Sequence, residues 1–190
     1  MVSISILVGY LAGSVPFAFL LARRAGIDVR RVGSRNVGAA NVLRSTGIGR
    51  ALLVTVLDVA KGAAAVLIAY VSTGGSGVAA LTGAAAVVGH IYPVWLRFHG
   101  GKGVAVAAGV FAMLTPIATV IATTLFLVIV AATRYVSLGS VAATLALPPA
   151  AWLTGAPVAV VASAAGTSAL ILFRHRANLQ RLSNGTERKI

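Results

Sequence analysis

Long apolar stretches alternate with short polar clusters along the whole chain. A membrane-spanning helix needs about 20 apolar residues, and about 17 suffice for a short one. Dividing the apolar stretches at charges, glycine clusters and prolines predicts an all-α polytopic integral membrane protein, a single membrane domain over residues 1–190 with seven transmembrane helices. The expected spans are residues 2–22, 51–71, 78–96, 103–115, 116–133, 138–153 and 157–173.

The division within residues 104–133 rests on helix length. One helix over this stretch would extend about 45 Å at about 1.5 Å per residue, whereas the hydrocarbon core is roughly 30 Å thick. Thr115 and Pro116 offer a break, and residues 154–157 offer a similar one in the next stretch. Fusing both pairs gives a five-span alternative, which helix length disfavours.

The positions of the basic residues predict the orientation. The chain has 16 Lys and Arg against 3 Asp and Glu, a net charge of +13. Cytoplasmic loops of membrane proteins carry an excess of Lys and Arg. With seven spans and the N-terminus outside, all basic residues except Lys61 fall on the cytoplasmic side. The cytoplasmic segments are then the loops 23–50, 97–102 and 134–137 and the C-terminal tail 174–190.

Composition supports this interpretation of the charge. The chain is 58% hydrophobic and 10% charged, whereas soluble domains have roughly 45–50% and about 25%. We therefore interpret the basic clusters as topology signals and anion ligands, and expect no nucleic-acid binding. The chain has no cysteine, and no His or acidic cluster has metal-ligand spacing, so we expect neither a metal nor a cofactor.

Polar residues gather in four clusters, each in or directly beside an expected cytoplasmic segment. They are Gly33–Asn41, Arg97–Gly103, Arg134–Ser140 and Arg174–Leu182. Arginine, lysine, serine, asparagine and backbone amides in glycine-rich loops bind phosphate and stabilise an oxyanion. Taken singly, Ser137 is interpreted as a helix cap, and Glu187 as a partner for a nearby arginine.

Three titratable residues lie inside expected spans. Asp58 and Lys61 are three positions apart on the second span, so they share a face and are expected to form an ion pair. Left unpaired, each would cost about 2.5–3.5 kcal/mol near the helix centre. His90, on the third span, is expected to be a packing or hydrogen-bonding residue.

Taken in order, these motifs resemble the bacterial acyl-phosphate:glycerol-3-phosphate acyltransferases of the PlsY type. The matching residues are Gly33-Ser34-x-Asn36-x-Gly38-Ala39-x-Asn41, Leu57-Asp58-x-x-Lys61-Gly62, Gly89-His90, Pro93, Gly100-Gly101-Lys102-Gly103-Val104-Ala105, Arg134-Tyr135-Val136-Ser137-Leu138, Arg174-His175-x-x-Asn178-x-x-Arg181-Leu182, Gly185 and Glu187. The chain departs from the family pattern at Arg35, where glycine is commonest, and at Ala40, where threonine or serine is commonest.

The resemblance implies an enzyme of the bacterial cytoplasmic (inner) membrane with its active site facing the cytoplasm. It implies transfer of a fatty acyl group from acyl phosphate to the 1-hydroxyl of glycerol 3-phosphate, giving lysophosphatidic acid and inorganic phosphate, the first committed step of phospholipid synthesis. The implied partners are these two substrates and membrane lipids, with no direct use of acyl-CoA or acyl carrier protein. We expect a monomer.

The resemblance also implies the site residues. The expected catalytic residues are Ser34, Arg44, Lys102, Ser140, His175 and Asn178. The expected substrate-binding residues are Gly33, Asn36, Gly38, Asn41, Gly100, Gly101, Gly103, Ser137, Arg181 and Glu187. Ser34, Arg44 and Lys102 would bind phosphates, while the amides of residues 100–103 and Ser140 would help to hold the acyl phosphate. His175 and Asn178 would orient glycerol 3-phosphate, and Arg181 would complete the anionic pocket.

Two alternatives remain open from the residues themselves. A small organophosphate or anion transporter would use the same basic residues and an interrupted helix, but the polar residues gather at one face and no inverted repeat is evident. A structural lipid-binding membrane protein would account for the arginines, but not for the pattern of Ser, Asn and Gly.

Overall fold

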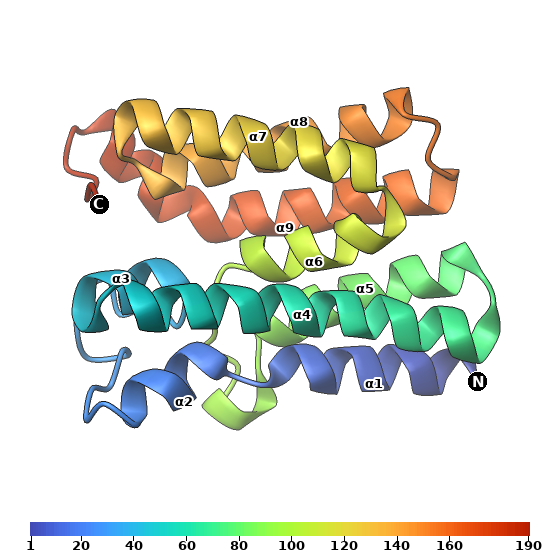
Figure 1. Cartoon of the computed structure of the whole chain (residues 1–190), viewed down its shortest axis with the longest axis horizontal. Coiled ribbons are helices and arrows are strands. Elements are labelled where there is room, and N and C mark those ends of the chain that lie inside the picture. Colours follow the sequence, from blue (N-terminus) through green and yellow to red (C-terminus); the bar gives the residue numbers. More distant parts are fainter. The chain divides into compact units, whose positions relative to one another are not determined.

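A computed structural model describes all 190 residues, and every regular element in it is a helix, as expected for an all-α protein. The chain forms two compact units, residues 1–110 and 111–190. The first contains α1 (Val2–Ser14), α2 (Phe17–Arg23), α3 (Ala39–Thr46), α4 (Ile48–Thr73), α5 (Ser76–Ile91), the 3₁₀ helix η1 (Val94–Leu96) and the start of α6 (Val104–Leu114). The second contains the end of α6, then α7 (Pro116–Thr133), α8 (Val136–Leu153) and α9 (Val158–Ser183) (Figure 1).

Six helical segments are long and apolar enough to cross a membrane. They are Val2–Arg23, Ile48–Thr73, Ser76–Leu96, Pro116–Thr133, Val136–Leu153 and Val158–Ser183. The remaining expected span, residues 103–115, corresponds to α6, which has 11 residues. At about 1.5 Å per residue it extends about 17 Å, roughly half of a hydrocarbon core of about 30 Å. The chain breaks between α6 and α7 at Thr115 and between α8 and α9 at residues 154–157, as the sequence predicts.

The first expected span is interrupted, a break that the sequence analysis did not predict. α1 ends at Ser14 and α2 begins at Phe17. Pro16 has no N–H to donate, and its ring disfavours the helical conformation of the residue before it. Val15 accordingly adopts an extended conformation, with ψ 115°. The break leaves the Val15 carbonyl oxygen facing other elements of the first unit.

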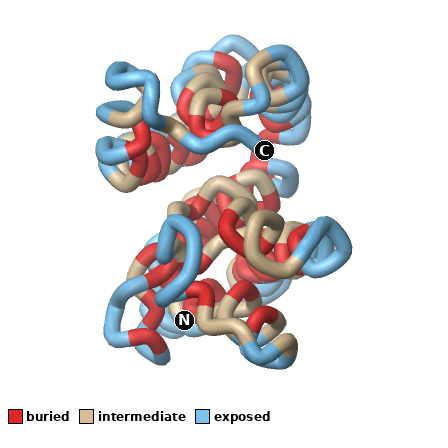
Figure 2. Tube along the Cα trace, turned by 90° about the vertical axis from the view of Figure 1, so that its left-hand side faces the viewer, coloured by how far each residue is buried: buried red, intermediate tan, exposed pale blue.

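Glycines bring α1 and α5 close together. A Cβ added at Gly13 would collide with the backbone of Ala86, and one at Gly89 would collide with the Tyr10 carbonyl oxygen. Small residues let helix backbones approach each other in a membrane, where apolar burial gives little driving force. In each unit, buried positions lie on the inner faces of the helices and exposed ones on the outer faces (Figure 2).

A compact apolar cluster supports the loop between α2 and α3. Its buried members are Ala18, Ala22, Val29, Val37, Val42, Ala51, Val54 and Leu96. They come from α2, α3, α4, η1 and the loop itself, so the loop that carries the first polar motif rests on a helical base.

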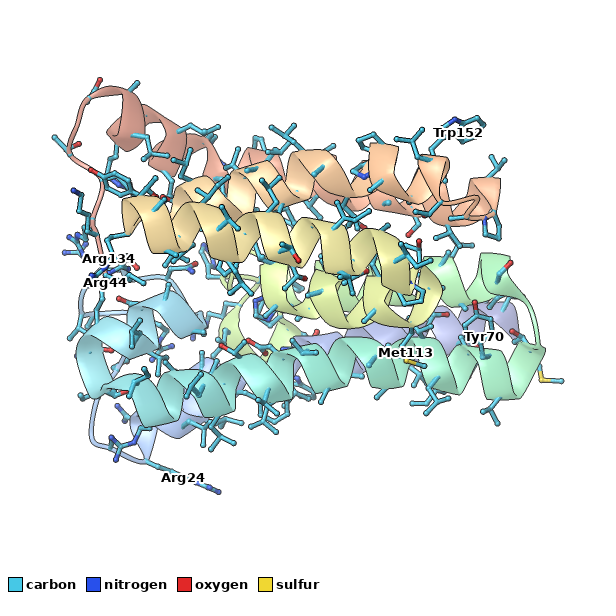
Figure 3. The ribbon with its side chains drawn as sticks, turned by 45° about the horizontal axis from the view of Figure 1, so that its top comes forward. Arg24, Arg44, Tyr70, Met113, Arg134 and Trp152 are labelled. Carbon is cyan, nitrogen blue, oxygen red and sulfur yellow. The ribbon has the colours of Figure 1, made fainter.

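The two ends of each unit differ in their side chains. In the first unit, Arg24 and Arg44 lie at one end, and Tyr70 lies near the other end of α4 (Figure 3). In the second unit, Arg134 precedes α8 and Trp152 lies near its end, so the two residues are at opposite ends (Figure 3). Arginine side chains thus lie at one end of each unit, an asymmetry that is typical of proteins that span a membrane.

Candidate active site

Asn41 holds the first polar loop in shape. Its side chain is buried, and its Nδ2 amide donates to the carbonyl oxygens of Val29 (2.9 Å), Val32 (3.2 Å) and Asn36 (3.1 Å). Its Oδ1 accepts the backbone amide of Ser34 at 2.9 Å. One buried amide thus joins α3 to four positions of the loop, and it leaves Ser34 exposed on the loop surface.

The loop needs glycine at position 33. Gly33 has φ +59°, and a Cβ there would collide with Oδ1 of Asn41, the atom that accepts the Ser34 amide. Arg35 also has a positive φ, +58°. This conformation costs a residue with a side chain roughly 1–2 kcal/mol relative to glycine, which explains why glycine is suited to a position where this chain has arginine.

The arginines beside the loop differ in their surroundings. Arg30 forms two parallel hydrogen bonds to Asp28, from Nε to Oδ1 at 2.9 Å and from Nη2 to Oδ2 at 2.7 Å. These bonds hold the pKa of the Asp28 carboxyl well below its usual 3.8. Arg44, on α3, is partly buried and donates to the Ala40 carbonyl oxygen at 3.3 Å. The charge of Arg30 is therefore balanced locally, and Arg44 stays a predicted phosphate ligand.

The glycine-rich cluster forms a tight loop between η1 and α6. The amides of Gly100 and Gly101 donate to the carbonyl oxygens of Ile91 and His90, each at 3.1 Å. We expected the amides of residues 100–103 to hold an anion, but in this structure the first two are bonded to the end of α5. Their part is to fix the loop against that helix.

Lys102 lies just before the first turn of α6. It is partly buried, and Gly103, with φ +93°, leads directly into the helix, which begins at Val104. The N-terminus of a helix carries partial positive charge. Lys102 and the start of α6 are adjacent in the chain, so both contribute positive potential to this part of the first unit.

A buried ionic cluster lies behind the glycine-rich loop. Lys61 Nζ lies 2.8 Å from Oδ1 of Asp58, which confirms the predicted ion pair, and 3.1 Å from Nδ1 of His90. The prediction that His90 is a hydrogen-bonding residue is also confirmed. No group of three or more His, Cys, Asp and Glu side chains is placed to hold a metal ion.

In the second unit, two serines lie in the first turns of α8. The helix begins at Val136, so Ser137 lies within it, and the prediction that Ser137 is the cap is wrong; the cap position is Tyr135. The Ser140 hydroxyl donates to the Val136 carbonyl oxygen at 2.8 Å. To donate to a phosphate, this hydroxyl would have to turn away from the helix backbone.

Glu187 folds back onto the end of α9. Its carboxylate accepts hydrogen bonds from Asn178 Nδ2 at 2.6 Å and from Arg181 Nε at 2.7 Å. The predicted pairing of Glu187 with an arginine is thus confirmed. Burial by itself raises the pKa of Glu187, but the hydrogen bonds from Asn178 and Arg181 outweigh burial and lower it. Three predicted substrate-binding or catalytic residues therefore meet in one hydrogen-bonded group.

His175 lies three positions before Asn178, on the buried side of α9. Its Nδ1 is 2.8 Å from the Ile171 carbonyl oxygen, one helical turn earlier. A carbonyl oxygen only accepts, so Nδ1 carries the proton, and in the neutral ring Nε2 is then an acceptor. His175 is 2% exposed, and it stays a predicted ligand of the substrate.

Acidification is expected to release the C-terminal tail. A carboxyl group whose pKa is lowered on folding stabilises the fold above its unfolded pKa, and this contribution disappears as the pH falls through the folded value. Because the Glu187 pKa lies below its usual 4.5, docking should be constant from neutral pH to about 4.5 and weaken below it. Hydrogen-exchange protection of residues 184–190 measures this. Glu187→Gln should remove the pH dependence, and a tail equally protected at pH 3 and pH 7 would contradict the assignment.

Sequence reasoning missed several contacts that shape these groups. The Asp28–Arg30 pair has a visible signal, two residues of opposite charge in one short loop. The contact between Lys61 and His90 joins α4 and α5 through two residues that are 29 positions apart. This separation along the chain does not indicate that the two side chains meet. The sequence also does not indicate that Gly101 lies so close to the His90 ring that a side chain at this position would collide with it.

Comparison with known proteins decides the family. The family described as glycerol-3-phosphate acyltransferase matches residues 3–185. The chain belongs to this family. The glycerol-3-phosphate acyltransferase of Rubrobacter xylanophilus is 45% identical over 184 residues, which cover 97% of this chain and 92% of the relative. That of Myxococcus xanthus is 44% identical over 191 residues, covering both proteins completely.

Two solved structures are also similar over the whole chain. Both are of PlsY (YgiH), an integral membrane glycerol 3-phosphate acyltransferase. The glycerol 3-phosphate form has a TM-score of 0.95 and 42% identity, and the lysophosphatidic acid form 0.93 and 40%. Each comparison covers 100% of this chain and 95% of the solved one.

The family assignment settles the class of protein. The chain is an acyltransferase and a multi-pass membrane protein of phospholipid biosynthesis. Of the alternatives that the residues left open, the transporter and the structural lipid-binding protein are therefore set aside.

Proposed function

We propose that this acyltransferase moves a fatty acyl group from an acyl phosphate to the 1-hydroxyl of glycerol 3-phosphate. The products are lysophosphatidic acid and inorganic phosphate. The observation that carries the proposal is the similarity over 100% of the chain to PlsY in its glycerol 3-phosphate and lysophosphatidic acid forms. The motifs that resemble this family support acyl phosphate as the donor. The excess of Lys and Arg (16) over Asp and Glu (3) also supports it, because cationic and amide groups bind phosphate.

Within each unit, the predicted site residues supply groups that suit this reaction. In the first unit, Ser34, Arg44 and Lys102 would bind phosphate oxygens, because charge-assisted hydrogen bonds to phosphate are the strong ones. In the second unit, His175 and Asn178 would orient glycerol 3-phosphate. Asn41 and Gly33 would act by shaping the loop, since the Asn41 side chain is occupied with loop backbone.

The bond changes balance without a protein nucleophile. The 1-hydroxyl oxygen of glycerol 3-phosphate attacks the acyl carbonyl carbon, and the bond from that carbon to the phosphate oxygen breaks. Inorganic phosphate leaves with the bonding electron pair, and one of its oxygens takes the hydroxyl proton. Nearby cations stabilise the negative charge that develops on the carbonyl and the leaving phosphate.

Orientation and location belong to the same proposal. Seven spans, with α6 as the short one, would put the N-terminus outside and the C-terminus in the cytoplasm, so that fifteen of the sixteen basic residues are cytoplasmic. The enzyme would work as a monomer in the bacterial cytoplasmic (inner) membrane, with the reaction on the cytoplasmic face. A cysteine added beside Lys189 and one added at Gly74 test the orientation, because only the second should react with an impermeant thiol reagent in intact cells.

The reaction itself is tested with purified protein in lipid. Palmitoyl phosphate should release inorganic phosphate only when glycerol 3-phosphate is present, and lysophosphatidic acid should appear in equal amount. Palmitoyl-CoA offered in place of palmitoyl phosphate should give no product. Product formed from palmitoyl-CoA at a similar rate would overturn the choice of donor, and no product from either donor would overturn the reaction.

Lys102→Ala is expected to lower kcat/KM for the acyl phosphate by about 10- to 100-fold, because a hydrogen bond to a charged group is worth about 1.5–3 kcal/mol. Arg24→Ala is the matched control, since Arg24 is exposed at the basic end of the first unit (Figure 3). It should stay within about twofold of the parent. Equal effects of the two substitutions would show that Lys102 acts only through general surface charge.

A further inference from the structure

The ionic cluster behind the glycine-rich loop is almost completely buried. The side chains of Lys61, Asp58 and His90 are 6%, 3% and 9% exposed. Besides the contacts to Asp58 and His90, Lys61 Nζ donates to the Val15 carbonyl oxygen at 2.8 Å. An ammonium has three N–H groups, and three acceptors surround this one. A charged lysine that donates to all three acceptors, with His90 accepting at Nδ1, satisfies this arrangement.

The cluster joins three parts of the first unit that are far apart in sequence. Lys61 and Asp58 are on α4, Val15 is in the break between α1 and α2, and His90 is near the end of α5. The Phe17 ring, just after the break, has its centroid 5.4 Å from Lys61 Nζ. A single side chain therefore fixes the interrupted first span and the end of α5 relative to α4.

The His90 ring continues this connection to the glycine-rich loop. A Cβ at Gly101 would collide with Nε2 of His90, and it would lie 2.8 Å from the carbonyl oxygen of Val37. The backbone of Gly101 thus lies between the His90 ring and the loop that carries Ser34. Both loops with predicted phosphate ligands meet at this glycine, and the cluster lies directly behind it.

Retaining this cluster needs a reason other than stability. Replacing a buried ion pair by well-packed apolar residues is often neutral or stabilising by about 1–4 kcal/mol, because desolvation of the charges offsets their attraction. A structural role alone would be served at least as well by apolar side chains. A position fixed by directed hydrogen bonds, however, cannot be reproduced by apolar contacts.

We propose that Lys61, Asp58 and His90 are positioning residues, which hold Gly101 and so set the place of Lys102 for the acyl phosphate. The inference rests on the proposed function. None of the three side chains touches the reacting atoms; each acts through the loop. A loop displaced by about 1 Å is enough to lower the rate by about 100-fold, so small losses of position should be visible in kinetics while the fold remains.

The first test removes both charges together. Lys61→Met with Asp58→Leu leaves no unpaired buried charge, so the double variant is expected to fold. Its KM for palmitoyl phosphate should rise at least 10-fold, while its KM for glycerol 3-phosphate stays within about twofold. His90→Phe keeps a ring beside Gly101 but loses the acceptor for Lys61, and it should raise the same KM. A smaller amount of folded enzyme would lower apparent kcat and leave both KM values unchanged, which would overturn the proposal.

Thr82→Val is the matched control on α5. Thr82 is fully buried, two turns before His90, and its hydroxyl has no hydrogen-bond partner. Removing a hydroxyl that makes no hydrogen bond is nearly neutral or stabilising. Both KM values of this variant should equal those of the parent. A rise in the KM for palmitoyl phosphate here would show that any change in the core of α5 moves the loop.

The second test does not depend on the reaction. The chain has no cysteine, so a nitroxide attached to His99→Cys reports motion of the glycine-rich loop, and one attached to Val71→Cys, exposed on α4, reports general motion. The charge-free double variant should narrow the spectrum at position 99 and leave that at position 71 unchanged. Identical spectra at position 99 would overturn the positioning role. An inactive parent enzyme with the expected spectral change would instead overturn only the proposed reaction.

Discussion

Gly101→Ala is expected to lower glycerol-3-phosphate-dependent acyl transfer at least about 100-fold. The added methyl group would collide with Nε2 of His90 and lie 2.8 Å from the carbonyl oxygen of Val37. The His90 ring cannot move cheaply, because its Nδ1 contacts Lys61. The backbone of Gly101 is also held, because its amide is bonded to the His90 carbonyl oxygen at 3.1 Å. The loop must therefore shift, and Lys102 shifts with it. A misplacement of about 1 Å is sufficient for a loss of this size.

Gly49→Ala gives the matched control for a methyl group on glycine. Gly49 lies in the first turn of α4, with no atom within 4 Å of the added Cβ. Alanine is favoured over glycine inside a helix by about 1 kcal/mol, so this variant should be as active as the parent and slightly more heat-stable. If Gly101→Ala kept more than a tenth of the parent activity with normal expression, the close packing of the loop would be unimportant.

The helices were largely predictable because their signals are local. Apolar runs, the proline at 116 and the glycine and proline of residues 154–157 define most helix ends without knowledge of the rest of the fold. The break at Val15 and Pro16 is also local, but it lies within an apolar run of full spanning length. An apolar run of this length predicts one helix, but Pro16 interrupts it, so the single helix expected over residues 2–22 is wrong.

The polar residues of the site were predictable as types, but not in their partners. The motif that ends at Asn41 marks a loop with donors and acceptors, yet only the fold shows that Asn41 uses its amide on the loop itself. The same holds for Gly100 and Gly101, whose amides are bonded to α5. Backbone groups satisfy each other first, and which of them do so depends on tertiary contacts that spacing along the chain does not encode.

The hydrogen-bonded group at the end of α9 shows what a sequence motif can predict. Asn178 and Arg181 are three positions apart on α9, so the sequence places them on one face. Glu187 follows a turn at Gly185, which has φ +68°, and the turn sends the carboxylate back to that face. The sequence predicts that Glu187 pairs with a nearby arginine, and this short-range geometry makes Arg181 the partner.

Asn178→Asp is expected to lower acyl transfer about 100- to 1,000-fold at neutral pH. The substitution keeps the shape of the side chain but replaces the Nδ2 donor, 2.6 Å from Oε1 of Glu187, by a carboxylate oxygen. Two negative charges would then face each other where both side chains are nearly buried. Glu187 keeps its ion pair with Arg181, so the added carboxylate is the buried charge without a partner. Such a charge costs about 3–5 kcal/mol, and each 1.4 kcal/mol is about a factor of ten in rate. Steady-state kinetics at pH 7 and pH 5.5 measure the effect, and activity should partly return at the lower pH as the two carboxylates share a proton.

Two further variants separate this cause from others. Asn184→Asp makes the same chemical change at an exposed position after α9, where a negative charge at a helix C-terminus costs less than about 1 kcal/mol, so its activity should stay near that of the parent. Glu187→Gln added to Asn178→Asp restores one donor and one acceptor with a single negative charge. The combined variant should recover hydrogen-exchange protection of residues 184–190. Unchanged activity in Asn178→Asp alone would mean that the amide of Asn178 contributes nothing to the reaction or to the docking of the tail.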